Sequence, residues 1–327
     1  MLKLKYLYEN YDLARTCLAF YEYDEESLDE MLSYFRISSN AIYPFRLKND
    51  VNQVCFLRLS PSEEKKFMNV VSEIDLIKWL NEKGFPAMKP VAMKTGEFVK
   101  EVHTEWGKYN VSCFARVSGD SLEDTKGTPY IVRGYGQILG KLHSLMKEYP
   151  STEKYRNYND LLNEIGDRLK EYDVPEMVRA EYRAVCSELE HLPISPLNYG
   201  VIHYDFEPDN VFYDATDSIF NVIDFDDAIC CWYALDIVRA LDALDDVIED
   251  DNVDNAECIF LEGYQSETDL TDEQKHSFLL MRRLVRLQEY ATILHVLSEP
   301  VDEMPDWMNE LIKKLKHKVK YLENTMK

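Results

Sequence analysis

The sequence predicts an α+β fold of two unequal lobes, a small N-terminal antiparallel sheet with one main helix and a larger, mostly helical C-terminal part. The chain has 327 residues, more than one ordinary compact core needs. Segments with extended character gather before residue 117, whereas helical spacing dominates from about residue 128 and is interrupted only over 200–228. We therefore expect an N-terminal lobe over residues 1–117 and a C-terminal lobe over 118–327.

Two hairpins are expected in the N-terminal lobe. Segments 37–49 and 50–60 both have extended character, and Lys48, Asn49 and Asp50 mark the turn between them. A second hairpin is expected within 97–124, where the apolar run NVSCFARV is typical of a buried strand. Together the two hairpins would form the small sheet.

The main helix of this lobe is expected to follow the first hairpin directly. Ser60 is suited to cap it and Pro61 to occupy its first position, and Gly84 with Pro86 would end it. Six apolar residues then fall at helical spacing: Phe67, Val70, Val71, Ile74, Ile77 and Leu80.

The C-terminal lobe is expected to be helical apart from one β insertion. Within 201–228 an apolar strand, a polar loop and two further strands succeed one another, with a turn near Asp214. Segments 281–297 and 307–327 have the pattern of amphipathic helices near the end of the chain.

Composition and charge narrow the possible partners. A net charge of −23 repels phosphate backbones and anionic membrane surfaces, so we expect neither nucleic acid nor membrane as a partner. The same charge would favour a cationic small molecule, although acidic surfaces often serve solubility alone. The seven cysteines contain no CxxC pair, and no apolar run approaches the ~18 residues of a membrane span, so we expect a cytoplasmic protein.

The segment VIHYDFEPDNVFYD, residues 201–214, sets a histidine, acidic residues and an asparagine between apolar strand residues. A hairpin that closes this loop would bring Asp205, Asn210 and Asp224 to the same end. Such oxygen ligands suit Mg²⁺, which takes only one or two of its ligands from a protein and the rest from water and phosphates. The pattern predicts phosphoryl transfer, in which one aspartate accepts a hydroxyl proton while the other two side chains hold the metal.

HYDFEPDNV followed by VIDFDDA resembles the catalytic loop and metal segment of the aminoglycoside phosphotransferase and choline kinase family, which has the protein-kinase-like fold. The resemblance extends, in the expected order, to VCFLRLS with SEIDLIKWLNEKGFP, then ILGKLHSL, ALDIVRAL and FLEGYQ. It implies a small-molecule kinase that uses Mg²⁺ to transfer the γ-phosphate of ATP or GTP. The implied acceptor is a hydroxyl of an aminoglycoside-like or amino-alcohol substrate.

The resemblance also implies roles for residues of the catalytic loop and the metal segment. Asp205 is implied as the catalytic base, and His203 as the residue that orients the loop. Asn210 and Asp224 are implied as Mg²⁺ ligands, and Asp226 as a secondary ligand or a support. Asp236 matches a structural aspartate of the family.

The nucleotide would contact the N-terminal lobe at three places. Arg58 stands where kinases have a phosphate-contacting lysine, and Glu73 where its helix partner is expected. No glycine occurs in ISSNAIYPF, so hydroxyl and amide groups of Ser38, Ser39 and Asn40 would have to cover the phosphates. In the segment resembling the hinge, the backbone of Arg116, Val117 and Ser118 would meet the adenine.

The acceptor would lie over Asp205, between that loop and the C-terminal helices. Acidic and aromatic residues there suit a cationic amino alcohol or aminosugar, although each of them could equally be a packing residue. The candidate residues are Asp227, Trp232, Tyr233, Asp242, Asp245, Arg283, Tyr290 and Trp307.

Two other functions remain open at this point. A protein Ser/Thr kinase would need an activation segment, and too few residues separate IDFDDA from LDIVRAL to supply one. A non-catalytic nucleotide-binding or regulatory protein is favoured by the glycine-free loop and disfavoured by Asp205, Asn210 and Asp224. The sequence is compatible with a monomer or a homodimer.

Overall fold

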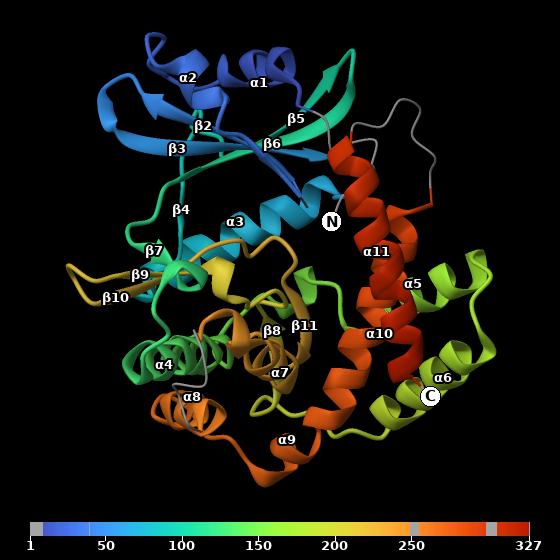
Figure 1. Cartoon of the computed structure of the whole chain (residues 1–327). Coiled ribbons are helices and arrows are strands. Elements are labelled where there is room, and N and C mark those ends of the chain that lie inside the picture. The colour runs from blue at the N-terminus through green and yellow to red at the C-terminus, as the bar shows by residue number, and fades with distance from the viewer. Residues whose placement is uncertain (1–8, 39, 249–254, 299–305, 327) are drawn as a thin grey trace.

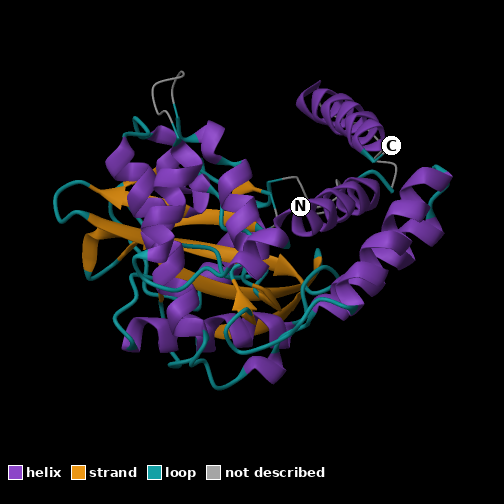
Figure 2. Cartoon of the chain, turned by 90° about the horizontal axis from the view of Figure 1, so that it is seen from below, coloured by secondary structure: helices purple, strands orange, loops and turns teal. Residues whose placement is uncertain are grey.

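The computed structural model describes residues 9–38, 40–248, 255–298 and 306–326. An antiparallel sheet with one long helix forms the N-terminal part, and helices form most of the rest (Figure 1). The view from below is dominated by helices (Figure 2). The α+β arrangement predicted from the sequence is thereby confirmed, while the boundary between residues 117 and 118 stays a prediction.

The N-terminal sheet has the strand order β1-β2-β3-β6-β4, and β5 pairs with β6. Both predicted hairpins are present, because β2 pairs with β3 and β5 with β6 in antiparallel register. One face of the sheet packs on two short helices, α1 (Tyr11–Leu18) and α2 (Leu28–Leu32). The strands are β1 (Arg36–Ile37), β2 (Ala41–Leu47), β3 (Asp50–Pro61), β4 (Lys89–Pro90), β5 (Val99–Thr104) and β6 (Gly107–Ala115).

The main helix, α3, spans Phe67–Glu82, so its predicted start was wrong. Ser60 and Pro61 belong to the end of β3, where Pro61 pairs with Tyr109. Proline is tolerated at the end of a strand because few ladder hydrogen bonds remain to be made there. The predicted apolar spacing does bury Val70, Ile74, Ile77 and Leu80, and the helix ends before Gly84, whose φ is +75°.

The C-terminal part contains seven longer helices and a five-residue helix, α9 (Asp272–His276), within its described residues. The longest, α11, runs along one side from the helices at the bottom to the level of the sheet (Figure 1). Ile37 of β1 packs there against Val296 and Met308. The other helices are α4 (Pro129–Met146), α5 (Tyr158–Glu171), α6 (Glu176–Glu190), α7 (Ala234–Asp242), α8 (Ala256–Gln265), α10 (Phe278–Val296) and α11 (Asp306–Thr325).

Short strands between the two parts carry the segment predicted to be catalytic. One pair joins β8 to β11, and a small sheet has the order β10-β9-β7. The backbone N–H of Val222 donates to Pro86 O, which ties this region to the end of α3. The strands are β7 (Asp120–Ser121), β8 (Tyr199–Ile202), β9 (Val211–Asp214), β10 (Ile219–Val222) and β11 (Ile229–Trp232).

Among the described residues, no helix is both long and apolar enough to cross a membrane.

Candidate active site

The loop between β8 and β9 is fixed by a buried carboxylate. Asp236, at the start of α7, accepts hydrogen bonds of 2.8 Å from the backbone N–H groups of both His203 and Tyr204. The Nε2 of His203 lies 2.8 Å from Ile223 O, in the metal segment. His203 therefore holds two loops together, and Tyr204 takes a left-handed conformation with φ of 74°.

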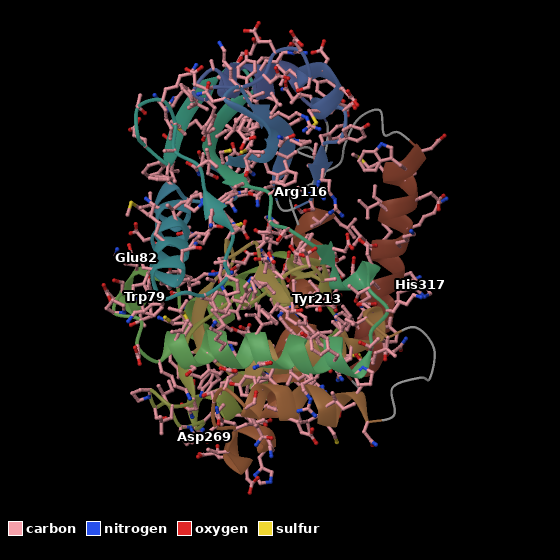
Figure 3. All side chains as sticks on the ribbon, turned by 90° about the vertical axis from the view of Figure 1, so that its left-hand side faces the viewer. Trp79, Glu82, Arg116, Tyr213, Asp269 and His317 are labelled. Atoms are coloured by element: carbon pink, nitrogen blue, oxygen red, sulfur yellow. The ribbon has the colours of Figure 1, made fainter. Side chains whose placement is uncertain are left out.

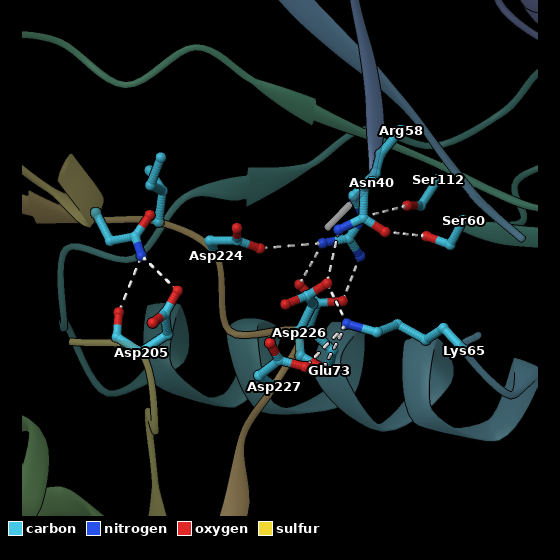
Figure 4. Close-up of polar contacts among 12 residues, drawn as sticks. Asn40, Arg58, Ser60, Lys65, Glu73, Ser112, Asp205, Asp224, Asp226 and Asp227 are labelled. Atoms are coloured by element: carbon cyan, nitrogen blue, oxygen red, sulfur yellow. Dashed lines mark hydrogen bonds and ion pairs between the residues drawn. The ribbon is translucent and has the colours of Figure 1, made fainter. Parts of the chain in front are cut away.

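Asp205 lies at the turn that follows. Asn210 Nδ2 donates to Asp205 O (2.9 Å) and Asp205 Oδ2 (3.3 Å); Asp205 is labelled in Figure 4. Arg239 of α7 approaches the same carboxylate to 4.0 Å and bonds to Glu207 at 3.3 Å. Removal from water raises the pKa of Asp205, and the guanidinium of Arg239 opposes that rise.

Arg239 and Glu207 were not predicted from the sequence. Burial and the nearby Asp205 carboxylate raise the pKa of Glu207 to about 7. Arg239 stands three residues after Asp236, so a helix that begins at the loop anchor also presents a basic side chain to the loop. That spacing is the only sequence signal for Arg239.

The β9–β10 hairpin brings the two predicted metal ligands together. The backbone N–H of Ile223 donates to Asn210 O at 3.0 Å, which places Asp224 beside the Asn210 loop. Asp224 has φ of 60°, a strained conformation for a non-glycine residue, and its Oδ1 lies 3.6 Å from Arg58 Nη1. Withdrawal from water and the Asp226 carboxylate raise the pKa of Asp224 well above its ordinary value. A divalent cation would relieve this like-charge crowding, so the pair Asn210 and Asp224 fits Mg²⁺.

Asp226 is held differently from Asp224. Its side chain is 3% exposed, forms an ion pair with Lys65 and accepts a 2.7 Å hydrogen bond from Asn40 Nδ2. Neutralisation by Lys65 and Arg58 outweighs burial and lowers the pKa of Asp226 far below its ordinary value. Of the two roles considered for Asp226, this engagement favours support over direct metal binding. Lys65, which precedes α3, was not predicted.

Arg58 and Glu73 form the predicted pair. Two guanidinium nitrogens of Arg58 bind the two carboxylate oxygens of Glu73, with 2.8 Å between Nη1 and Oε1, and both side chains are buried (Figure 4). Arg58 Nε also donates to Ser112 Oγ at 3.2 Å. The pairing is therefore confirmed, while the contact of Arg58 with phosphate stays a prediction.

The glycine-free loop departs from the expectation at one residue. Asn40 is 3% exposed, and besides binding Asp226 it accepts a hydrogen bond from Ser60 Oγ. A buried amide engaged at both ends does not cover phosphates, so that role was wrong for Asn40. Ser38 lies in the loop, its backbone N–H bonded to Asn40 O, and Ser39 lies outside the described residues.

In the expected hinge, the backbone N–H of Arg116 is already used. It donates to Val54 O at 2.9 Å, so this N–H cannot also meet an adenine edge, while a contact through the Arg116 carbonyl stays a prediction. Figure 3 shows Arg116 between the sheet and the helical part. Ser118 O accepts a 3.1 Å hydrogen bond from Asn221 Nδ2, and Val117 follows Arg116 on the same segment. Adenine contacts by Val117 and Ser118 stay predictions.

A cavity of about 170 Å³ opens among residues of the catalytic loop, α3, α5 and α10. Its wall includes Tyr204, which precedes the predicted base, and Asp226 and Asp227 of the metal segment. Further charged and polar lining comes from three directions: Lys65 and Glu73 near α3, Arg156, Glu164 and Arg168 near α5, and Gln288, Thr292 and His295 of α10. The sequence did not indicate these residues as acceptor contacts, because they are distant along the chain.

Of the predicted acceptor residues, only Asp227 lines this cavity. Trp232 and Tyr233 are fully buried, and Trp232 Nε1 donates to Pro193 O, so both are packing residues. Tyr290 is also buried and bonded to Glu323.

The remaining candidates lie elsewhere. Arg283 joins α10 to α6 through Glu181 and Glu188, and Trp307 is half exposed on α11. Asp242 pairs with Arg282, and both line a different cavity together with Asp245. These candidates therefore do not line the cavity that borders Tyr204 and Asp227.

Comparison with curated proteins adds relatives that are kinases. The amicoumacin kinase of Bacillus subtilis (strain 168) is 22% identical over 226 residues, 66% of this chain and 66% of that protein. A homoserine kinase of Phenylobacterium zucineum (strain HLK1) is 29% identical over 236 residues, 68% of this chain and 67% of the relative. The matched part thus spans about two thirds of the length of these relatives.

Solved structures share the fold. Amicoumacin kinase hAmiN in complex with AMP-PNP, Ca²⁺ and Ami has a TM-score of 0.78 at 17% identity, covering 98% of this chain and 95% of that one. A microcompartment-associated aminopropanol kinase has a TM-score of 0.68 at 17% identity, with 97% and 95% covered. Both likenesses extend over nearly the whole chain.

The model of the Phosphotransferase enzyme family (APH) matches residues 36–278, most of the chain. This match includes the catalytic loop, the metal segment, Arg58 and Glu73, which the structure brings to one site. The chain is a phosphotransferase that belongs to this family and has the protein-kinase-like fold.

Proposed function

We propose that this protein transfers the γ-phosphoryl group of ATP or GTP, bound with Mg²⁺, to a hydroxyl group of a small amine-bearing molecule. One observation carries the proposal. Asp205 is held by Asn210 and approached by Arg239, and its neighbour in the chain, Tyr204, lines a small cavity that also borders Asp227. Donor and acceptor would thus meet at a single carboxylate.

Each residue has a task in this reaction. Asp205 accepts the proton of the acceptor hydroxyl while the hydroxyl oxygen bonds to the γ-phosphorus, and the nucleoside diphosphate leaves. Asn210 and Asp224 would hold the metal, which would neutralise charge on the phosphates. Arg58, kept in place by Glu73, would bind a phosphate group, and Lys65 with Asn40 would keep Asp226 in position.

The cavity favours a small acceptor. Its volume of about 170 Å³ is below the roughly 300–1,000 Å³ of pockets that bind drug-sized ligands. An amino alcohol suits this space better than a multi-ring aminoglycoside. The printed names of the relatives include homoserine kinase and aminopropanol kinase, and both are consistent with a small acceptor.

Nucleotide binding is the step of this proposal that needs a test first, because ISSNAIYPF lacks the glycines that let a loop approach phosphates. A thermal-shift comparison of ATP and GTP, each with and without Mg²⁺, tests the donor side of the proposal. We expect a Mg²⁺-dependent rise in Tm with one nucleotide, reduced in Asp224→Ala. No shift with either nucleotide would count against the kinase function.

A further inference from the structure

The Tyr204 side chain is 4% exposed, yet its hydroxyl has no hydrogen-bond partner among the residues that the structure describes. The ring lies between two guanidinium groups, 4.8 Å from Arg239 and 5.6 Å from Arg156 to its centroid. Tyr204 also lines the cavity that borders Asp227. A buried hydroxyl without a partner is costly, so a polar group of a bound ligand would satisfy it.

One part of the cavity wall has two arginines on a single carboxylate. Arg156 Nη1 lies 2.9 Å from Glu164 Oε2, and Arg168 Nη2 lies 2.5 Å from Glu164 Oε1. This part of the wall therefore has more guanidinium than carboxylate groups. The two arginine side chains are 33% and 20% exposed, so they could bind a ligand carboxylate.

Another part of the wall has two carboxylates on one lysine. Lys65 forms ion pairs with both Asp226 and Asp227, at 3.3 Å for the second, so one cation serves two carboxylates. The Asp227 side chain is 35% exposed and remains accessible from the cavity.

The other charged side chains of the wall have partners of their own. Glu73 pairs with Arg58, Glu64 with His295 and Lys154 with Asp75. The wall thus has two arginines on one carboxylate and two carboxylates on one lysine, all bordering one small space.

We infer that the cavity recognises a zwitterion, a hydroxyl-bearing α-amino acid, with its ammonium toward Asp227 and its carboxylate toward Arg156, Arg168 and the Tyr204 hydroxyl. This inference rests on the proposed function and narrows it, because a simple amino alcohol lacks the carboxylate. The hydroxyl oxygen bonds to the γ-phosphorus, its proton passes to Asp205, and the products are an O-phospho amino acid and a nucleoside diphosphate.

Matched acceptors that differ only in the carboxylate test this inference. The pairs are L-homoserine with 3-amino-1-propanol, L-serine with ethanolamine, and L-threonine with 1-amino-2-propanol. We expect one amino acid to be phosphorylated with kcat/KM about 10- to 100-fold above its partner, the order of one charge-assisted hydrogen bond. The same amino acid should raise Tm in the absence of turnover, whereas its partner should not.

Substitutions test which side chains recognise the carboxylate of the acceptor. Arg156→Gln and Arg168→Gln should raise KM for the preferred amino acid about tenfold with little change in kcat, and should leave KM for the amino alcohol unchanged. Tyr204→Phe keeps the ring and removes only the hydroxyl. Arg183→Gln, on the exposed face of α6, is the matched control and should behave as the wild type.

The outcomes separate the inference from the proposed function. If an amino alcohol has the same kcat/KM as its matched amino acid, or if Arg156→Gln changes KM equally for both, the inference of a zwitterionic acceptor is wrong. The proposed kinase function is not affected by either result. A Mg²⁺-dependent nucleotide shift without phosphorylation of any pair also overturns the inference. Absence of both the shift and phosphorylation contradicts the proposed function itself.

Discussion

The metal side and the acceptor side of the site are built differently. On the metal side most polar groups already have protein partners: Arg58 binds Glu73, Lys65 and Asn40 hold Asp226, and Asn210 binds Asp205. On the proposed acceptor side one hydroxyl is unpaired within the described chain, two arginines share one carboxylate, and two carboxylates share one lysine. The metal side always binds the same phosphate groups, so its side chains can be held in place by protein partners. The acceptor side needs polar groups that are satisfied only when the ligand binds.

The largest expected effect comes from Asp205→Asn, which keeps the shape of the loop and removes the base. We predict that kcat falls by about a thousandfold while the Mg²⁺-nucleotide thermal shift persists. Steady-state kinetics and thermal shift would be measured side by side. Asp209→Asn, exposed in the same loop, is the control. Substantial turnover by the Asp205 variant would refute its role.

Breaking the buried pair of Arg58 and Glu73 tests how much the contacts on the metal side stabilise the fold. Arg58→Met leaves Glu73 uncompensated and should lower the free energy of unfolding by about 3–5 kcal/mol, as measured by urea denaturation. Lys83→Met, which breaks an exposed pair with Glu148, should cost no more than about 1 kcal/mol. Equal losses in the two variants would mean that the buried pair has no special importance.

Asp224→Ala should weaken Mg²⁺-nucleotide binding itself. A loss of at least about 10- to 100-fold in affinity is expected, since even outer partners of metal sites contribute that much. Isothermal titration with and without Mg²⁺ measures it, and Asp217→Asn, in the exposed β9–β10 turn, is the control. If Mg²⁺ still improved nucleotide affinity as much as in the wild type, Asp224 would not be a metal ligand.

Asn40→Ala tests the link between the glycine-free loop and the metal segment. It removes the bonds to Asp226 and Ser60, so KM for the nucleotide should rise by about tenfold with kcat less affected. Asn52→Ala, exposed on β3, should change neither constant. An unchanged KM for the nucleotide in Asn40→Ala would mean that this loop does not contribute to nucleotide binding.

The smallest effect is expected from Arg239→Gln, because Arg239 acts on Asp205 from 4.0 Å without touching substrate. Asp205 works as an ionised base, so activity falls as pH drops through its raised pKa. Removing the positive charge raises that pKa further and should move the acidic limb of kcat/KM up by about one pH unit. Arg239→Lys keeps the charge and should leave the limb near its wild-type position; identical shifts in both variants would point to a structural role.

The catalytic loop and the metal segment could be predicted because their spacing is local. Asp205, Asn210 and Asp224 lie within one strand–loop–hairpin unit, and the short β9–β10 turn brings their ends together. Helical spacing likewise brought Glu73 to the buried side of α3, facing Arg58. The start of α3 was misplaced because a proline is equally acceptable at the end of a strand and in a first helical turn.

The acceptor side could not be predicted because its residues come from separate elements. Tyr204, Arg156 and Gln288 meet only after α5, α7 and α10 have packed together. Trp232 and Tyr233 carry the same composition signal as binding-site aromatics, yet they fill the core. Tertiary packing, not residue type, decided between the two roles.

Phosphoryl transfer itself is tested most directly by mass spectrometry of the acceptor pairs after incubation with ATP or GTP and Mg²⁺. We predict that the wild type adds one phosphoryl group to a hydroxyl-bearing acceptor, that chelation of Mg²⁺ stops the reaction, and that Asp205→Asn forms almost no product. Product formation that is unaffected by both chelation and the Asp205 substitution would contradict a Mg²⁺-dependent kinase with Asp205 as its base.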